Sequence, residues 1–255
     1  MNIIFPMLGN GSRFILEGYR IPKYLLPLAE EKILYFVLYG FRKLSKSRFI
    51  FVVRKDHLIY GVKSEITRIS NILNIDEFKI VEVEEPTRGQ ADSAKLAFPV
   101  CIPNIPILIF NIDTIHLALN PLFDDKYDGI LETFNAKGDH WSFAELDDNN
   151  LVKKVAEKKR ISANCSNGLY YFQDINLFNY CYSETYLSKS NNECDYLDET
   201  YIAPIYNILI ENGKKVLNRN VDKKDILPSG IPNEYTFLNS KYKFKKELEN
   251  EFEDF

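Results

Sequence analysis

Short apolar runs alternate with helical patterns through the first 111 residues, and this alternation constrains the fold more than any other feature of the chain. The apolar runs predict strands at 2–7, 48–54, 79–84 and 106–111. The segments between them predict helices at 33–44, 58–73 and 91–98, because their apolar residues recur at helical spacing. Repeats of this kind form a parallel, doubly wound α/β sheet. Ligands of such sheets bind beyond the carboxyl ends of the strands, which directs attention to loops 8–23, 85–92 and 111–116.

The second half of the chain is less regular. Strands are expected at 129–134, 141–146, 151–156 and 168–173, as a small mixed or antiparallel extension. A helix is expected at 198–211, with Gly213 just past its end as a C-cap. The charged tail 241–255 carries Phe244, Leu248 and Phe252 at helical spacing, so a C-terminal helix there could pack on the body or on the second subunit of a homodimer.

Composition excludes several classes of protein. The formal net charge is −4, and basic residues are scattered among acidic ones, which argues against a nucleic-acid binder. No apolar run reaches 18 residues, and the N-terminus does not resemble a signal peptide, so we expect a cytoplasmic protein without a membrane partner. The four cysteines are far apart and form no CxxC pair, which favours free thiols over disulfides or a zinc site.

The most specific motif is Gly9-Asn10-Gly11-Ser12-Arg13, which directly follows the first expected strand. Two glycines at this spacing let the backbone turn tightly and present N–H groups to an anion. Arg13 adds a permanently charged fork suited to phosphate oxygens, and Lys23, after Pro22, supplies a second cation. A GxG pair alone is usually an ordinary turn, whereas strand, GxGxR and PK together favour a phosphate site.

These residues resemble the opening signature of the nucleotidyltransferases, which include sugar-1-phosphate nucleotidylyltransferases and phosphocholine cytidylyltransferases. The resemblance implies a Rossmann-like mixed sheet, of the architecture shared with GT-A enzymes, and a requirement for Mg²⁺. It also implies that Arg13 and Lys23 are catalytic. The signature loop would bind the nucleotide through Leu8, Gly9, Asn10, Gly11 and Ser12.

Two further segments match the family in the first half. The stretch from Thr87 to Ala91 resembles its second nucleotide-binding loop, in which Gly89 would admit the base and Gln90 would hydrogen-bond it. Taken alone, this stretch is more often a capped helix start. Asp113 follows the most apolar strand and resembles the metal-binding aspartate, and a carboxylate fixed at a strand end suits Mg²⁺. Its alternative role is to cap the next turn.

The second half carries the matches to the acceptor site. Glu157 and Lys158 resemble a strand-borne EK pair, in which the lysine would meet the acceptor's phosphate and the glutamate a hydroxyl or amine. Asn167 and Gly168 resemble an NxG segment that admits the substrate closely. Glu199 resembles an acidic position of the acceptor pocket, although acidic residues at a helix start are commonly only dipole partners.

The resemblance departs from the family near the C-terminus. Many members carry a second metal-binding aspartate two residues before a GTP-like turn, but Pro228 occupies that position ahead of Gly230. Either Asp225 or Asp222 substitutes after a loop shift, or Asp113 is the one firm metal ligand. We take Asp225 as a weak second candidate.

The resemblance implies one nucleotidyltransferase domain over 1–255, with a nucleotide-binding half at 1–115, an acceptor-binding half at 116–240 and the tail at 241–255. Its partners would be a nucleoside triphosphate and a phosphorylated small metabolite, and pyrophosphate would leave. An ionised phosphate nucleophile needs no general base, which fits a chain with three histidines.

The substrates stay open. CTP and phosphoglutamine, for modification of a capsular polysaccharide, are the named hypothesis, because the stretches 86–93 and 198–207 look like capsule-associated nucleotidyltransferases. The alternatives are a sugar 1-phosphate with UTP or dTTP, and phosphocholine. Two readings from other classes are a GT-A glycosyltransferase, which would want a D-x-D pair where 111–113 read Asn-Ile-Asp, and a non-catalytic nucleotide-binding homologue.

Overall fold

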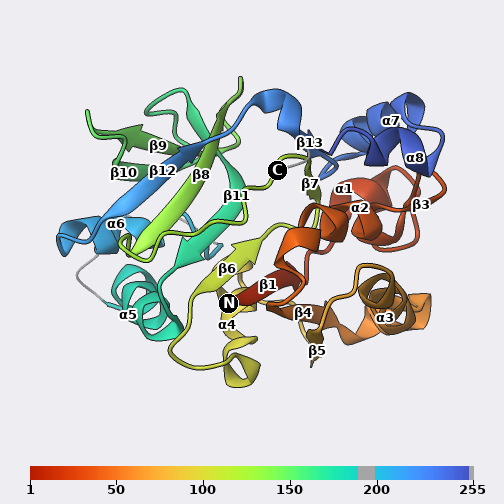
Figure 1. Cartoon of the computed structure of the whole chain (residues 1–255), viewed down its shortest axis with the longest axis horizontal. Helices are drawn as coiled ribbons and strands as arrows, with labels where there is room; N and C mark the ends of the chain where they lie inside the picture. The colour runs from red at the N-terminus through yellow and green to blue at the C-terminus, as the bar shows by residue number, and fades with distance from the viewer. Residues whose placement is uncertain (189–198, 253–255) are drawn as a thin grey trace.

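The computed structural model describes residues 1–188 and 199–252 (Figure 1). Its strands are β1 (Asn2–Met7), β2 (Pro27–Leu28), β3 (Glu31–Lys32), β4 (Arg48–Arg54), β5 (Glu77–Val83), β6 (Ile107–Phe110), β7 (Thr114–His116), β8 (Gly129–Asn135), β9 (Ser142–Leu146), β10 (Val152–Glu157), β11 (Asn164–Phe172), β12 (Val216–Asn220) and β13 (Ile226–Pro228). Its α-helices are α1 (Ser12–Leu16), α2 (Ile33–Gly40), α3 (Val62–Ile72), α4 (Gln90–Lys95), α5 (Ile175–Tyr186), α6 (Ile205–Glu211), α7 (Pro232–Lys241) and α8 (Lys245–Glu249).

A mixed sheet, nine-stranded in the described residues, forms the centre of the molecule. Its main path has the order β10-β9-β11-β6-β1-β4-β5, and β8 joins β11 to β12. The strands β6, β1, β4 and β5 pair in parallel, as expected from the first 111 residues. Beyond them, β11 pairs antiparallel with β6 through Leu169–Phe172, so both halves of the chain share the sheet. The Rossmann-like mixed sheet predicted from the sequence is confirmed.

The two faces of the sheet are covered by different helices, because side chains alternate along each strand. In β1, Ile3 and Phe5 lie in one hydrophobic core, and Ile4 between them lies in the other. The core around Phe5 contains apolar residues of α2, α3, α7 and α8. The core around Ile4 contains those of α4, α5 and α6. This two-sided covering is the doubly wound arrangement.

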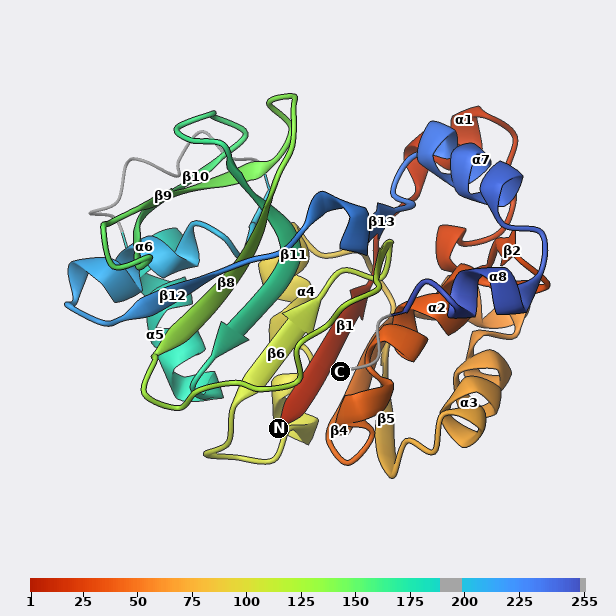
Figure 2. The same ribbon diagram turned by 45° about the horizontal axis from the view of Figure 1, so that its top comes forward.

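The C-terminal tail packs on the first half of the chain, where Figures 1 and 2 show α7 and α8 beside α1 and α2. Leu248 and Phe252 are buried, whereas Phe244 is exposed. The hydroxyl of Tyr35 in α2 donates to Oε1 of Glu249 at 2.6 Å. The tail was expected to pack on the body of the chain or on a second subunit, and the structure shows it packed on the body. In the described part of the tail, which ends at Phe252, the regular helix that lies wholly within it is the five-residue α8.

Two expected helices begin later than the sequence suggests. Gly61, with φ of +75°, interrupts the helix expected at 58–73, so α3 starts at Val62 and Ile59 is exposed rather than inward. The helix expected at 198–211 starts only at Ile205, because the backbone of Thr200 pairs with Arg88 and Ala91 instead. Asp198, the first residue of that expected helix, lies outside the described residues.

Several elements of the second half were not expected, namely α5, α7, β12 and β13. Asp174 caps α5 by accepting the backbone N–H groups of Asn176 and Leu177 at 2.7 and 2.8 Å. Cys101, Cys165 and Cys181 are buried free thiols, and Cys194 lies outside the described residues. Among the helices that the structure describes, none is long and apolar enough to cross a bilayer.

Candidate active site

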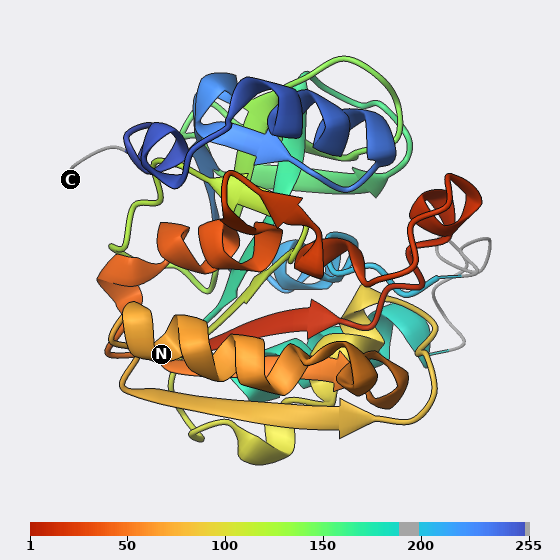
Figure 3. The same ribbon diagram turned by 90° about the vertical axis from the view of Figure 1, so that its right-hand side faces the viewer.

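The site lies where the winding of the sheet changes direction. From β1 the chain winds outward to β4 and β5 and then returns to β6 on the other side of β1. Two loops therefore diverge from the carboxyl ends of β1 and β6, and a crevice forms between them. The signature loop follows β1, and Asn111 and Asp113 follow β6. In Figure 3 the signature loop and α1, in red, project beyond the end of β1.

Lys23 and Asp113 form an ion pair in this crevice. Lys23 begins a short 3₁₀ helix (Lys23–Leu25) after Pro22, and its Nζ donates to Oδ2 of Asp113. Both side chains remain partly accessible, at 20% and 26% exposure. Two groups that the sequence assigned to phosphate and to metal are thus in direct contact and reachable from solvent.

A cavity of 380 Å³, called here the loop cavity, separates the two nucleotide-binding loops predicted from the sequence. Leu8, Gly9, Asn10 and Ser12 line one side of it, and Thr87, Gly89 and Gln90 line the other. Gly11 lies between these residues but is not part of its wall, and its φ of +62° provides the turn into α1. The structure therefore brings together segments about 80 residues apart in sequence.

Gly89 is required by a close approach of the backbone. A Cβ at this position would overlap the main chain of Thr200. The N–H of Ala91 donates to the carbonyl of Thr200 at 3.0 Å, and the N–H of Thr200 donates to that of Arg88 at 3.3 Å. Ala91 itself is buried and does not line the loop cavity, so its contribution is to hold the segment 199–201 against the loop.

A second cavity of 680 Å³, called here the sheet cavity, lies between the ends of β6 and β7 and the strands β9–β11. Lys23, Gln90 and Asp113 belong to the walls of both cavities, so the two are adjacent. Arg13 lines the sheet cavity and not the loop cavity. This position puts Arg13, which the sequence resemblance predicts to be catalytic, at the cavity that Glu157 and Asn167 also line.

Glu157 of β10 is a buried carboxylate in the wall of the sheet cavity. The hydroxyl of Ser142 in β9 donates to its Oε2. Burial raises the pKa of Glu157 above its ordinary value, since water can no longer solvate the charged form. Its carboxyl oxygens can accept a hydrogen bond from a ligand hydroxyl or ammonium, which is the role that the sequence resemblance implies for Glu157.

Gly168 links the strand β11 to the crevice. Its φ is +89°, and a Cβ there would coincide with the side-chain amide of Asn111. Asn111 in turn accepts a hydrogen bond at Oδ1 from the amide of Gln90. The absence of a side chain at 168 is therefore what lets Asn111 hold Gln90, although Gln90 was predicted to bind a base directly.

Asn167 points into the protein as well as bordering the sheet cavity. Its amide donates to Oε1 of Glu132 at 2.6 Å, and the same oxygen lies 2.5 Å from Nε2 of His116. Both Glu132 and His116 are fully buried. Burial alone would raise the pKa of Glu132, but His116, Asn167 and Arg219 hold it below its ordinary value. Asn167 is thus part of a buried polar network beneath the cavity.

Lys158 lies at the edge of the sheet cavity rather than in its wall. Its φ of +52° directs the side chain toward Tyr201, whose hydroxyl accepts from Nζ of Lys158 and donates to Oε2 of Glu199. Glu199 and Tyr201 do line the cavity. Lys158 therefore meets the site at its rim, through Tyr201 and through an ion pair of 4.0 Å between its Nζ and Oε2 of Glu199.

Asp225 does not approach Asp113. In the pairing of β13 with β7, Pro228 stands opposite Thr114, next to Asp113, while Asp225 precedes the strand and its carbonyl accepts from Leu117. The weak second metal candidate is thus placed away from the crevice. Another carboxylate is nearer, because Glu234 lines the sheet cavity with Asp113. Burial, and then the charge of Asp113, raise the pKa of Glu234.

Sequence reasoning missed several cavity residues, namely Trp141, Tyr170, Tyr201 and Glu234. Glu234 carried one usable signal, its position three residues after Ile231 at the start of a helix, where its Oε2 accepts the N–H groups of Gly230 and Ile231 at 2.9 and 3.2 Å. The aromatic residues carried none, since only the folding of β9, β11 and the 199–201 segment brings them together.

The residues in hand can hold Mg²⁺. Asp113 offers a partly exposed carboxylate at a strand end that borders both cavities. Among the described residues, no three His, Cys, Asp or Glu side chains converge as a closed metal cage. Mg²⁺ does not require one, because it binds through one or two carboxylates together with substrate phosphates and waters. The donor set therefore fits the ion that the sequence resemblance implied.

Comparison with known proteins places this geometry in context. No family profile matches the sequence, and neither does any curated protein. Among solved structures, a nucleoside-diphosphate-sugar pyrophosphorylase from Vibrio cholerae RC9 is 33% identical, with a TM-score of 0.84 over 93% of this chain and 99% of that chain. An inositol-1-phosphate CTP transferase from T. maritima is 16% identical (TM-score 0.71, 98% and 95% covered). A UDP-glucose pyrophosphorylase complexed with UDP-glucose is 17% identical (TM-score 0.73, 94% and 97% covered). The last two share the fold.

Proposed function

This chain belongs to the nucleotidyltransferase family that includes nucleoside-diphosphate-sugar pyrophosphorylases, and we propose that it joins a nucleoside monophosphate to a phosphorylated small metabolite. An oxygen of the acceptor's phosphate attacks the α-phosphorus of a nucleoside triphosphate in line. The bond to the bridging oxygen breaks, and pyrophosphate leaves with the electron pair. The family assignment argues against the glycosyltransferase alternative, and the assay below, activity with Mg²⁺, tests the non-catalytic one.

The observation that carries the proposal is the Lys23–Asp113 pair at the border of two cavities. A nucleotide in the loop cavity and an acceptor in the sheet cavity would meet at this pair. Lys23 and Arg13 would then neutralise the charge that develops on the transferred phosphoryl group. Asp113 would hold Mg²⁺, which when bound supplies further charge neutralisation to the phosphates.

CTP and phosphoglutamine, for capsular polysaccharide biosynthesis, remain the first pair to test. The support is the likeness of stretches 86–93 and 198–207 to capsule-associated enzymes, of which only residue 198 lies outside the described part. The carboxylates of Glu157, Glu199 and Glu234 in the sheet cavity add to it, because carboxylates pair well with the ammonium of an amino-acid acceptor.

A sugar 1-phosphate is the second candidate acceptor, with UTP or dTTP as donor. The observation that favours it is the 33% identity to a nucleoside-diphosphate-sugar pyrophosphorylase. The same carboxylates also accept hydrogen bonds from sugar hydroxyls. Phosphocholine is a third acceptor of the same class, whose cation would meet the carboxylates and aromatic rings of this cavity.

The test is pyrophosphate release with Mg²⁺ from CTP, UTP, dTTP, ATP and GTP, each against phosphoglutamine, phosphocholine and hexose 1-phosphates. Release that depends on one donor and one acceptor identifies both substrates. A Lys23→Ala enzyme, purified in parallel, controls for a contaminating activity. Donor hydrolysis without any acceptor dependence across the panel would contradict transfer to these acceptor classes.

A further inference from the structure

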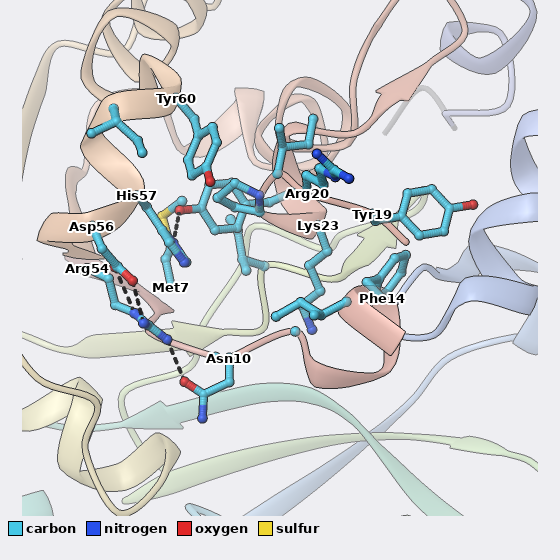
Figure 4. Close-up of a pocket in the computed structure, with 18 of the residues that line it drawn as sticks. Met7, Asn10, Phe14, Tyr19, Arg20, Lys23, Arg54, Asp56, His57 and Tyr60 are labelled. Atoms are coloured by element: carbon cyan, nitrogen blue, oxygen red, sulfur yellow. Dashed lines mark hydrogen bonds and ion pairs between the residues drawn. The ribbon is translucent and has the colours of Figure 1, made fainter. Parts of the chain in front are cut away.

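A third cavity, called here the rear cavity, lies on the other side of the signature loop from the sheet cavity. It has a volume of 680 Å³ and is bounded by residues 9–24 of the signature segment and by 54–60, which follow β4. Figure 4 shows Asn10, Arg54 and Lys23 toward one end of this cavity and Tyr60 toward the opposite end. The polar end is the one that the signature loop forms.

The rear cavity adjoins the loop cavity through shared wall residues. Gly9, Asn10, Lys23 and Ile112 line both of them. Lys23 also lines the sheet cavity, so all three cavities border this one residue. The proposed reaction has three parts to accommodate: the nucleoside, the acceptor and the leaving pyrophosphate. In-line displacement further requires that acceptor and pyrophosphate lie on opposite sides of the α-phosphorus.

Arg54 is held at the polar end of the rear cavity by two partners. Its Nε donates to Oδ1 of Asp56 at 2.9 Å and its Nη2 to Oδ2 at 2.5 Å, as a fork. Its Nη1 donates to Oδ1 of Asn10 in the signature loop at 2.5 Å. A guanidinium has five N–H groups, and in the described part of the chain each Nη keeps one that is not used.

We propose that the rear cavity receives the β- and γ-phosphates of the nucleoside triphosphate and that Arg54 binds them through these two N–H groups. This assignment rests on the proposed function, because it takes the base to the loop cavity and the acceptor to the sheet cavity. A planar guanidinium fixed by a carboxylate presents parallel donors to phosphate oxygens with little loss of side-chain entropy. Asp56 offsets part of the charge, and the exposed Arg20, across the cavity from Arg54, adds a further positive charge to its lining (Figure 4).

The competing explanation is that Arg54 acts only by fastening the signature loop through Asn10. The two roles differ in which ligands they affect. A β,γ-phosphate site matters for a nucleoside triphosphate and is irrelevant to the corresponding monophosphate. A loop fastener matters for both, since both need the loop cavity.

The experiment is calorimetric titration of the wild type, Arg54→Gln and Asn10→Ala with CTP and with CMP, in Mg²⁺, with the triphosphate and monophosphate pairs of the other four donors in the assay panel run in parallel. We expect Arg54→Gln to weaken triphosphate binding about tenfold or more, as for a lost charged hydrogen bond, and to change monophosphate binding less than about twofold. Asn10→Ala should lower both affinities by a similar factor. Thermal unfolding of each variant checks that the chain is folded.

Equal losses for triphosphate and monophosphate in Arg54→Gln would overturn the inference and assign Arg54 to loop fastening. Unchanged triphosphate binding would overturn it as well. Both results leave the proposed function intact. A wild-type chain that binds neither nucleotide of any pair would instead remove the proposed function, and this inference with it.

Discussion

Replacement of Gly168 by alanine is expected to destabilise the protein through two separable effects. The first is conformational, because φ is +89° at this residue and a side chain there costs about 1–2 kcal/mol. The second is steric, because the new Cβ would coincide with the amide of Asn111. Forcing a carbon into filled space typically costs about 1–3 kcal/mol. The expected loss in free energy of unfolding is therefore about 2–5 kcal/mol.

Gly213 offers a matched control for the conformational effect alone. Its φ is +71°, and nothing lies within 4 Å of where its Cβ would be. Gly213→Ala should therefore cost about 1–2 kcal/mol. The difference between the two variants measures the overlap with Asn111. Urea unfolding, followed by the fluorescence of the one tryptophan, Trp141, gives both values.

Gly168→Ala should also change activity, because it displaces Asn111, which holds Gln90 in the wall shared by the loop and sheet cavities. We expect Gly168→Ala to reduce kcat/KM even at low temperature, where the variant is folded, and Gly213→Ala to leave it unchanged. The reasoning is refuted if Gly168→Ala costs no more stability than Gly213→Ala, since the steric overlap would then be relieved without consequence.

Three further predictions concern the crevice and the network beneath it. Arg13→Ala, Lys23→Ala and Asp113→Ala should each lower turnover by about 10²-fold or more with circular dichroism unchanged, and normal turnover in all three would remove the site assignment. Glu132→Gln should lower the free energy of unfolding at pH 7 by about 3 kcal/mol, since it breaks a buried charge network. The pKa of Glu132 in the fold lies below its ordinary 4.5, so the stabilisation by its charge is present above that pH and fades as the pH falls. The difference in free energy of unfolding between Glu132→Gln and the wild type, measured with urea, should therefore narrow in acid. A difference that stays constant with pH would contradict this assignment. Glu157→Gln should raise the acceptor's KM about tenfold while the KM of the nucleoside triphosphate stays constant. Steady-state kinetics with each substrate varied measures both values, and an equal rise in both would contradict an acceptor-specific role of Glu157.

The strands β1, β4 and β6 of the first half were predictable because they are largely buried on both faces. β1 and β4 are continuous apolar runs, and their bounds agree with the sequence expectation at 2–7 and 48–54. β12 and β13 were not predictable in the same way, because Val216–Asn220 is mostly polar and forms a strand only through its parallel pairing with β8. Tertiary pairing, not local propensity, decides such segments.

The residues of the candidate site differ in the same way in how far the sequence predicts their positions. The signature loop and Asp113 follow strands, so the sheet topology alone brings them together. The position of Lys158 depended on a positive φ that no propensity indicates, and that of Asp225 on the register of β13 with β7. Contacts such as Arg54 with Asn10, 44 residues apart, are set by packing and leave no local signal in the sequence.

The antiparallel junction of β11 with β6 has a consequence for how the substrates meet. Four residue pairs, from Leu169–Phe110 to Phe172–Ile107, join the half that carries the loop cavity to the half that carries most of the sheet cavity. A hinge between the halves would have to break these backbone hydrogen bonds. The relative orientation of the two cavities is therefore fixed when the chain folds. Two bound reactants are then aligned by a rigid site, so no further conformational entropy of the protein is lost in bringing them together.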